Sequence, residues 1–277
     1  WSAWDFLGEA CIGDWTYHSY NGLPLLAGQG MIDITGKPLA SMYFMQIVWG
    51  LRKEPFIGVR PLNHAKEAPT TGAWQFTNAI DSWSWQGYEG EKAVVEVYAN
   101  SASVRLLLNG KEIVNKPVKK YKTLFKLPYQ PGTLTAEALD ERGNVISSHS
   151  LTTAGEETVL RVTPDKMVLC ANNQALCYLP IEFTDKAGNL KPYMEQRVEV
   201  AVAGAATLAG FGSALCKTNE VFDKPYHHSY RGRCLAVLRA GSTPGKAKVT
   251  VTSAGMEPVT IEVEVNDEIS LIWPSDR

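Results

Sequence analysis

Long apolar runs, an excess of basic charge and paired cysteines are all missing from this 277-residue sequence. No apolar stretch approaches the ~20 residues that span a bilayer, so we expect no membrane insertion. The formal net charge is -2 and the pI is about 6.3, which gives no basic field for nucleic acid. The stretch Gly210–Ser213 lacks both the spacing of a nucleophile elbow and the Gly-Lys-Ser/Thr ending of a phosphate loop. We therefore expect no cofactor.

The five cysteines are odd in number and include no C-x-x-C pair, so the spacing typical of a metal site is absent. Cys177 and Cys234 are separated by about the distance that separates the disulfide-bonded cysteines of an immunoglobulin domain. No tryptophan lies between them to complete that pattern. We favour free buried thiols, because free cysteine is a common core residue.

Two adjacent histidines, His227 and His228, lie close to Asp223 in the segment FDKPYHHSYRGR. Adjacent side chains point apart on extended backbone, and no third ligand is spaced to join them. We predict a solvated loop here rather than a metal site. The lysines between Lys116 and Lys126 favour a solvated strand edge that resists pairing with another sheet.

The first fifty residues are unusual. They open with WSAWDFLGEACIGDW, run through a Gly- and Pro-rich loop, and close with an apolar stretch that predicts a helix over residues 39–49. Gly36 and Pro38 mark the helix start, and Gly50 occupies the position of a left-handed C-cap residue. The next clear strand begins only near residue 93. Because a lone strand is not stable, this segment is expected to be part of something larger.

The motifs WSAWDFLGE and GMIDITGKP, with the helix ending in VWG, resemble the last strand, loop and helix of the (β/α)8 barrel of glycoside hydrolase family 2, β-galactosidase type. The resemblance continues through the rest of the chain, although the loop YNGLPLLAGQG fits less well. It implies that residues 1–52 belong to a catalytic barrel. It also implies an enzyme that cleaves terminal β-glycosides with retention, and a periplasmic or extracellular bacterial location. The absence of an initiator Met and a signal peptide leaves the export route open.

Short alternating strands then predict a mainly β fold with two immunoglobulin-like β-sandwiches, over residues 56–154 and 155–270. Asn109-Gly110, between two apolar runs, is the strongest short hairpin signal. Asp140–Asn144 and Asp185–Asn189 share an Asp-x-x-Gly-Asn turn pattern. A barrel takes about 250 residues, so two sandwiches plus a barrel remnant fit this length and a complete barrel does not.

We expect no catalytic residue in this chain. Retaining glycosidases need two carboxyl groups about 5–5.5 Å apart. Asp5, Glu9 and Asp14 lie on one expected strand and its loop, and they cannot flank a glycosidic bond unaided. The resemblance implies instead that Trp4 forms the floor of the sugar pocket, against the C–H face of the carbohydrate substrate. Asp5 either bonds a sugar hydroxyl or holds the following loop.

The aromatic cluster between Trp74 and Tyr88 has two interpretations. Exposed rings at Trp83 and Trp85 would form a glycan-stacking platform, whereas buried rings would pack in the core or against the barrel, which we favour. The expected partners are a carbohydrate, the rest of the barrel and, through the exposed face of helix 39–49, a second copy of the chain. The competing hypothesis is a non-catalytic glycan-binding or adhesion array.

Overall fold

The computed structural model describes residues 9–10, 26–27, 31–65, 77–215 and 218–267. It is mainly β, and its chain divides into two compact units, which we treat separately. The first unit comprises Trp1–Glu157, Asp185–Tyr193 and Leu215–Thr218, and the second unit comprises the rest. No helix in the described ranges is long and apolar enough to cross a membrane.

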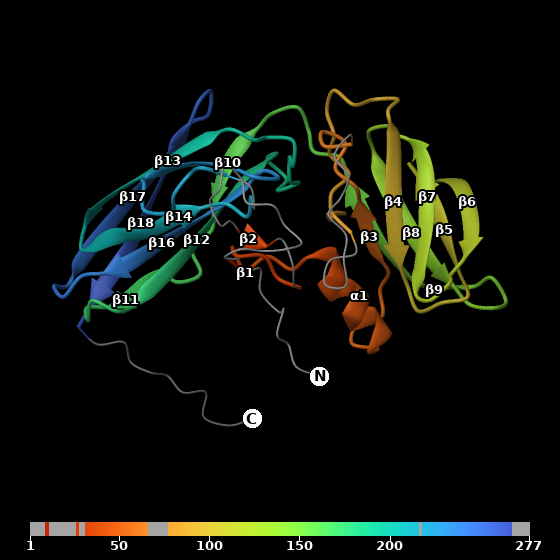
Figure 1. The fold of residues 1–277 in the computed structure, drawn as a ribbon, viewed down its shortest axis with the longest axis horizontal. Helices are drawn as coiled ribbons and strands as arrows, with labels where there is room; N and C mark the ends of the chain where they lie inside the picture. The colour runs from red at the N-terminus through yellow and green to blue at the C-terminus, as the bar shows by residue number, and fades with distance from the viewer. Residues whose placement is uncertain (1–8, 11–25, 28–30, 66–76, 216–217, 268–277) are drawn as a thin grey trace. The chain divides into compact units, whose positions relative to one another are not determined.

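The first unit contains a three-stranded and a four-stranded antiparallel sheet (Figure 1). The three-stranded sheet has the order β3-β4-β7, from Phe56–Val59, Lys92–Tyr98 and Lys122–Pro128. The four-stranded sheet has the order β6-β5-β8-β9, from Lys111–Pro117, Ser103–Leu108, Thr133–Leu139 and Val145–Thr152. Val95, Phe125, Leu106 and Ala136 come from both sheets and share one core, so the unit is a two-layer sandwich.

Alternation along the strands explains this packing. In β5, β7 and β8 every second residue is buried, which is typical of strands with one face on a core and one on solvent. Strand β4 differs, because Val95 and Val97 face the core while Glu96 and Tyr98 are also fully buried on the opposite face. The hairpin predicted at Asn109-Gly110 is confirmed. Both residues have positive φ, 52° and 76°, as a type I′ turn requires.

Helix α1 spans Ala40–Val48 and lies next to β3 (Figure 1). It begins after Leu39, two residues beyond Pro38, and its C-cap is Trp49. Gly50 has φ +71°, and the amide of Leu51 donates to the carbonyl of Gln46 over 2.8 Å, which confirms the predicted left-handed stop. Only Ala40, Ser41 and Ile47 are fully buried, so the helix is less enclosed than its apolar sequence indicates.

The rest of the expected barrel remnant lies mostly outside the described residues. Of residues 1–30 the structure describes only β1, Glu9–Ala10, paired antiparallel with β2, Leu26–Ala27. Residues 31–39 contain an isolated antiparallel bridge between Ile32 and Pro38. The assignment of residues 1–52 to a barrel therefore stays a prediction.

The second unit also has two sheets. One has the order β10-β12-β16-β14, from Val159–Val162, Leu176–Thr184, Arg233–Ala240 and Ala206–Gly212. The other has the order β11-β18-β17-β13-β15, from Val168–Cys170, Val259–Asn266, Gly245–Ser253, Arg197–Gly204 and Tyr226–His228. Leu179, Phe183, Val249 and Val263 from both sheets share a second core.

Cys177 and Cys234 are free thiols, as favoured from the sequence. They lie on neighbouring strands of one sheet, where Cys177 pairs with Leu238 and Cys234 with Ile181. A four-residue offset is about 13 Å along a strand, well beyond the reach of a disulfide. Burial raises the pKa of the Cys177 thiol to about 11, which keeps it protonated at neutral pH.

Two short strands, β11 and β15, are not predicted from the sequence. Strand β11 has only three residues, and β15 lies in the segment predicted to be a solvated loop. That prediction is wrong, because His227 is 0% exposed and its strand pairs with β13. The charged and Pro-containing flanks of the segment conceal the alternation of Tyr226, His227 and His228, in which only the middle side chain is buried.

Candidate functional site

The predicted sugar-contacting residues Trp4 and Asp5 lie outside the described residues, so their roles stay predictions. Trp74 and Phe76, the first members of the aromatic cluster, also fall in an undescribed range. The other members of the cluster can be examined directly.

Trp83 and Trp85 are both 0% exposed and belong to the core of the first unit. The indole Nε1 of Trp83 donates to the carbonyl of Gln130 over 3.0 Å, and its ring meets Tyr129 edge-on at 4.9 Å. The amide of Trp85 donates to the hydroxyl of Tyr129 over 3.0 Å. Because neither indole has a free face, the glycan-stacking prediction is wrong, and the core interpretation is correct.

The outer face of the β3-β4-β7 sheet is covered by α1 through a series of aromatic contacts. Tyr43 stacks on Phe56 with ring centres 4.4 Å apart, and Phe56 stacks on Tyr98 at 5.6 Å. Phe44 meets Tyr98 edge-on at 5.4 Å. Such pairs are each worth about 0.5–1.5 kcal/mol beyond the area they bury. These contacts fix α1 on the first sandwich.

Glu96 lies on the same face, and both of its carboxylate oxygens have partners. One of its carboxylate oxygens, Oε1, accepts from Arg60 Nε and from Thr77 Oγ1, both at 2.8 Å. The other, Oε2, accepts from the Tyr98 hydroxyl at 2.8 Å and lies 2.6 Å from Lys122 Nζ. The Glu96 side chain is 0% exposed, so a buried carboxylate is matched by two cations and two hydroxyls.

This environment fixes the protonation state of Glu96. Burial alone would raise the pKa of the carboxyl group, but the hydrogen bond and charge of Lys122, with the bonds from Arg60 and Tyr98, hold it below its ordinary value. Burial and the neighbouring charge of Glu96 raise the pKa of Tyr98. A carboxylate that stays ionised and fully bonded is a poor proton donor, so Glu96 anchors the fold rather than serving as a catalytic acid.

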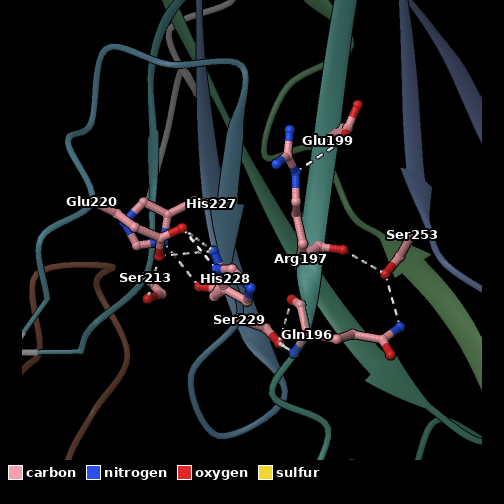
Figure 2. Close-up of polar contacts among 9 residues, drawn as sticks. All are labelled: Gln196, Arg197, Glu199, Ser213, Glu220, His227, His228, Ser229 and Ser253. Carbon is pink, nitrogen blue, oxygen red and sulfur yellow. Dashed lines mark hydrogen bonds and ion pairs between the residues drawn. The ribbon is translucent and has the colours of Figure 1, made fainter.

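The second unit has its own polar cluster, made of Ser213, Glu220, His227 and His228 (Figure 2). His227 Nδ1 lies 2.9 Å from the backbone carbonyl of His228, which can only accept, so Nδ1 carries the proton. The same nitrogen lies 3.3 Å from Glu220 Oε2 and 3.5 Å from Ser213 Oγ. The Nε2 atom of His227 is buried and has no hydrogen-bond partner among the described residues.

Glu220 joins the two histidines. Its Oε1 lies 2.7 Å from His228 Nδ1, and its Oε2 accepts from the His228 amide over 3.1 Å (Figure 2). Burial would raise the pKa of Glu220, but the hydrogen bonds from His228 lower it below its ordinary value. Phe222 stacks on His227 at 5.7 Å, and any side chain at Gly212 would collide with the Phe222 ring.

The geometry of this cluster excludes two kinds of chemistry. In a Ser-His-acid triad the serine and the acid bind opposite ring nitrogens, whereas here Ser213 and Glu220 both approach Nδ1. Among the residues that the structure describes, no group of three or more His, Cys, Asp or Glu side chains could hold a metal ion. We interpret the cluster as a means of fixing β15 and the preceding loop to the sandwich.

A neighbouring set of hydrogen bonds fixes the start of β13 (Figure 2). The Gln196 amide donates to Ser229 Oγ over 3.0 Å, and the Ser229 hydroxyl donates to the carbonyl of Met194 over 2.7 Å. The side chain of Gln196 donates to Ser253 Oγ over 2.8 Å. We therefore interpret the Glu96 cluster and the Ser213–His228 cluster as structural.

Comparison with known proteins finds similarity to glycoside hydrolase family 2. The model of glycoside hydrolase family 2 C-terminal domain 5 matches residues 160–262, and a domain of unknown function matches residues 90–147. The chain is 26% identical over 270 residues to a protein named beta-galactosidase BoGH2A from Bacteroides ovatus, with 96% of this chain and 28% of that protein covered. It is 26% identical over 262 residues to a putative beta-glucuronidase from Formosa agariphila, with 92% of this chain and 22% of that protein covered.

Solved structures of glycoside hydrolases are also similar to this chain. A glycosyl hydrolase family 2 member from Bacteroides cellulosilyticus has a TM-score of 0.77 and 26% identity, and the match covers 90% of this chain and 34% of that one. A beta-glycosidase from Bacteroides vulgatus shares the fold, with a TM-score of 0.72 at 21% identity over 95% of this chain and 30% of that one. The chain thus spans about a quarter to a third of the length of these relatives. Residues 160–262 match the C-terminal domain 5 of glycoside hydrolase family 2, and most of the chain is similar to part of family 2 proteins.

Proposed function

We propose that this chain is part of a retaining glycoside hydrolase that cleaves terminal β-glycosides, with β-galactosides as substrates. The observation that carries the proposal is the match of 96% of the chain to a protein named as a beta-galactosidase. The putative beta-glucuronidase matches almost as much of the chain, so β-glucuronides are the competing substrates for the assay. In this proposal the chain supplies one wall of the sugar pocket and two accessory β modules.

The chain alone is proposed to be inactive. Retaining hydrolysis needs a proton donor and a nucleophile about 5–5.5 Å apart. Glu96 is occupied by Arg60, Thr77, Tyr98 and Lys122, and Glu220 is bound to His228. The acid/base and the nucleophile would therefore come from the part of the relatives that this chain does not match.

Trp4 is the proposed floor of the pocket. Asp5 is proposed to accept a hydrogen bond from a sugar hydroxyl beside it. A flat aromatic ring excludes water from the apolar face of a pyranose, and this contact helps to orient the sugar for attack. Burial of Trp83 and Trp85 removes the observation that would have favoured a glycan-binding array instead.

A substitution at Trp4 tests the proposal. In the protein encoded by the longest reading frame that contains this chain, we expect Trp4→Ala to lower kcat/KM for p-nitrophenyl β-galactoside by about 10²-fold. Tyr178→Ala is the matched control, because Tyr178 is 41% exposed on β12, in the second unit. Near-normal kinetics of the Trp4 variant would remove Trp4 from the pocket, and faster hydrolysis of the β-glucuronide would reassign the substrate.

Self-association is a second proposed property. Trp49 and Leu51, at the end of α1, are 53% and 73% exposed, and large apolar side chains at this exposure favour association. Light scattering of the chain should show a dimer that the double substitution Trp49→Gln/Leu51→Gln dissociates. A monomer at all concentrations would contradict this.

A further inference from the structure

A groove of about 560 Å³ lies in the first unit, where the chain crosses from one sheet to the other. It is lined by Phe44 of α1 and by seven residues of β6, β7 and the turn between them, namely Lys116, Pro117, Lys119, Lys120, Lys122, Thr123 and Leu124. Strands β6 and β7 are both edge strands. The Thr123 hydroxyl donates to the Pro117 carbonyl over 3.0 Å and so fixes the two edges to each other.

Four of the eight lining residues are lysines, and their charges are not equally neutralised. Lys122 lies 2.6 Å from the buried carboxylate of Glu96. Lys116 donates to the carbonyl of Leu124 over 2.9 Å and lies 5.2 Å from the centre of the Phe125 ring. A neutral carbonyl and a ring leave its charge uncompensated. Lys119 and Lys120 are exposed, and the structure describes no carboxylate within ion-pair distance of either.

Backbone conformation keeps these charges together. Lys120 and Tyr121 have φ of 50° and 63°, so the turn is tight, and Lys119 bridges directly to Lys122. Guarding an exposed edge needs only a lysine along the strand. This arrangement instead gathers several lysines around a concave surface with an aromatic and aliphatic wall from Phe44, Pro117 and Leu124. The volume falls in the range of small-ligand sites, about 300–1,000 Å³.

We propose that this groove binds an anionic saccharide unit, one that carries a carboxylate or a sulfate group. The ammonium groups of Lys116, Lys119 and Lys120 bind the anion as point charges. Phe44 and Leu124 cover the apolar C–H face of the ring. The saccharide part of this proposal rests on the proposed function, whereas the requirement for negative charge rests on the groove alone.

Calorimetric titration of the 277-residue chain tests the groove. The probes are a chondroitin sulfate tetrasaccharide, a tetragalacturonate, a neutral galactotetraose and a single-stranded DNA oligonucleotide of equal charge. We expect saturable binding of at least one acidic saccharide and no binding of galactotetraose. Binding of the acidic saccharide should be weaker at physiological ionic strength, where the Debye length is about 8 Å, than at low ionic strength. A stronger response to chondroitin sulfate assigns the anion as sulfate, and a stronger response to galacturonate assigns it as carboxylate.

The variant Lys119→Gln/Lys120→Gln should bind the acidic saccharide about tenfold more weakly, because exposed ion pairs each contribute up to about a factor of five. Lys111→Gln/Lys126→Gln is the matched control, since it removes the same charge from β6 and β7, the strands that flank the turn, at positions outside the groove. Both variants change exposed side chains, and thermal melting confirms that each stays folded.

Three results would overturn the proposal: no binding of either acidic saccharide, equal or tighter binding of the DNA, or an equal loss in the control variant. The first would assign the lysines to edge protection. Failure of the groove and failure of the proposed function are distinguishable. If the longer protein hydrolyses β-galactosides but the chain does not bind acidic saccharides, only the groove proposal is contradicted. Binding without any β-glycosidase activity contradicts the proposed function alone.

Discussion

The polar sites of the two units bury their titratable groups in opposite ways. In the first unit each carboxylate oxygen of Glu96 contacts one cationic side chain and one hydroxyl group. In the second unit three acceptors crowd Nδ1 of His227, while its Nε2 is buried without a partner in the described part of the chain. The difference teaches that burial alone says little about stability. What decides is whether every polar atom is satisfied.

The largest effect is expected at Glu96. Glu96→Gln keeps one acceptor oxygen, puts an NH2 group that cannot accept a hydrogen bond against the donors of the other oxygen, and removes the negative charge that faces Arg60 and Lys122. It should lower the free energy of unfolding of the first unit by about 2–3 kcal/mol. Tryptophan fluorescence in urea follows this unit, because Trp83 and Trp85 lie in its core.

A matched control is Glu182→Gln in the second unit. Glu182 pairs with Arg233 at 2.9 Å, but its side chain is 27% exposed. A partly exposed pair contributes about 0–1 kcal/mol, so the loss should be below 1 kcal/mol. Equal losses in the two variants would contradict the distinction between satisfied burial and surface pairing.

The stability from Glu96 should also depend on pH. Because the folded-state pKa lies below the ordinary value of 4.5, this contribution is complete above that value and is lost as the pH falls through the folded pKa. The difference in free energy of unfolding between wild type and Glu96→Gln should therefore shrink as the pH is lowered below 4.5. A difference that stays constant over this range would mean that the Glu96 charge is not responsible.

A small effect is expected at Glu220. Its partner His228 is 54% exposed, so Glu220→Gln should cost about 1 kcal/mol or less. The measurable consequence is local, since β15 is only three residues long and is held at the sheet edge. Hydrogen exchange should speed up at Val198 and Val200 of β13, whose strand borders β15, and not in β17. Faster exchange throughout the second unit would show that the cluster stabilises the whole sandwich.

Most of the β architecture could be predicted from alternation and turn chemistry. The hairpin at Asn109-Gly110 and the Asp185 turn are both decided by local backbone preferences, and both occur. Local rules fail where tertiary contacts decide. Glu96 lies in the alternating run AVVEVYA, yet both faces of its strand are buried, because α1 and its aromatic contacts cover the face opposite the core.

The candidate sites could be predicted less well from the sequence than the fold. Trp83 and Trp85 are two residues apart, which fits an exposed stacking platform as well as a buried core, and only the burial distinguishes the two. The groove at Lys116–Leu124 depends on how two edges and a helix converge, which composition does not reveal. Trp4 and Asp5 are known only through the resemblance, because they lie outside the described residues.

The most direct test of the proposed function is the stereochemistry of hydrolysis. The longest reading frame that contains this chain should hydrolyse p-nitrophenyl β-galactoside, and proton NMR should show β-galactose as the first product, as retention requires. The 277-residue chain alone should release no nitrophenol. Activity of the chain alone, or α-galactose as the first product of the longer protein, would contradict the account.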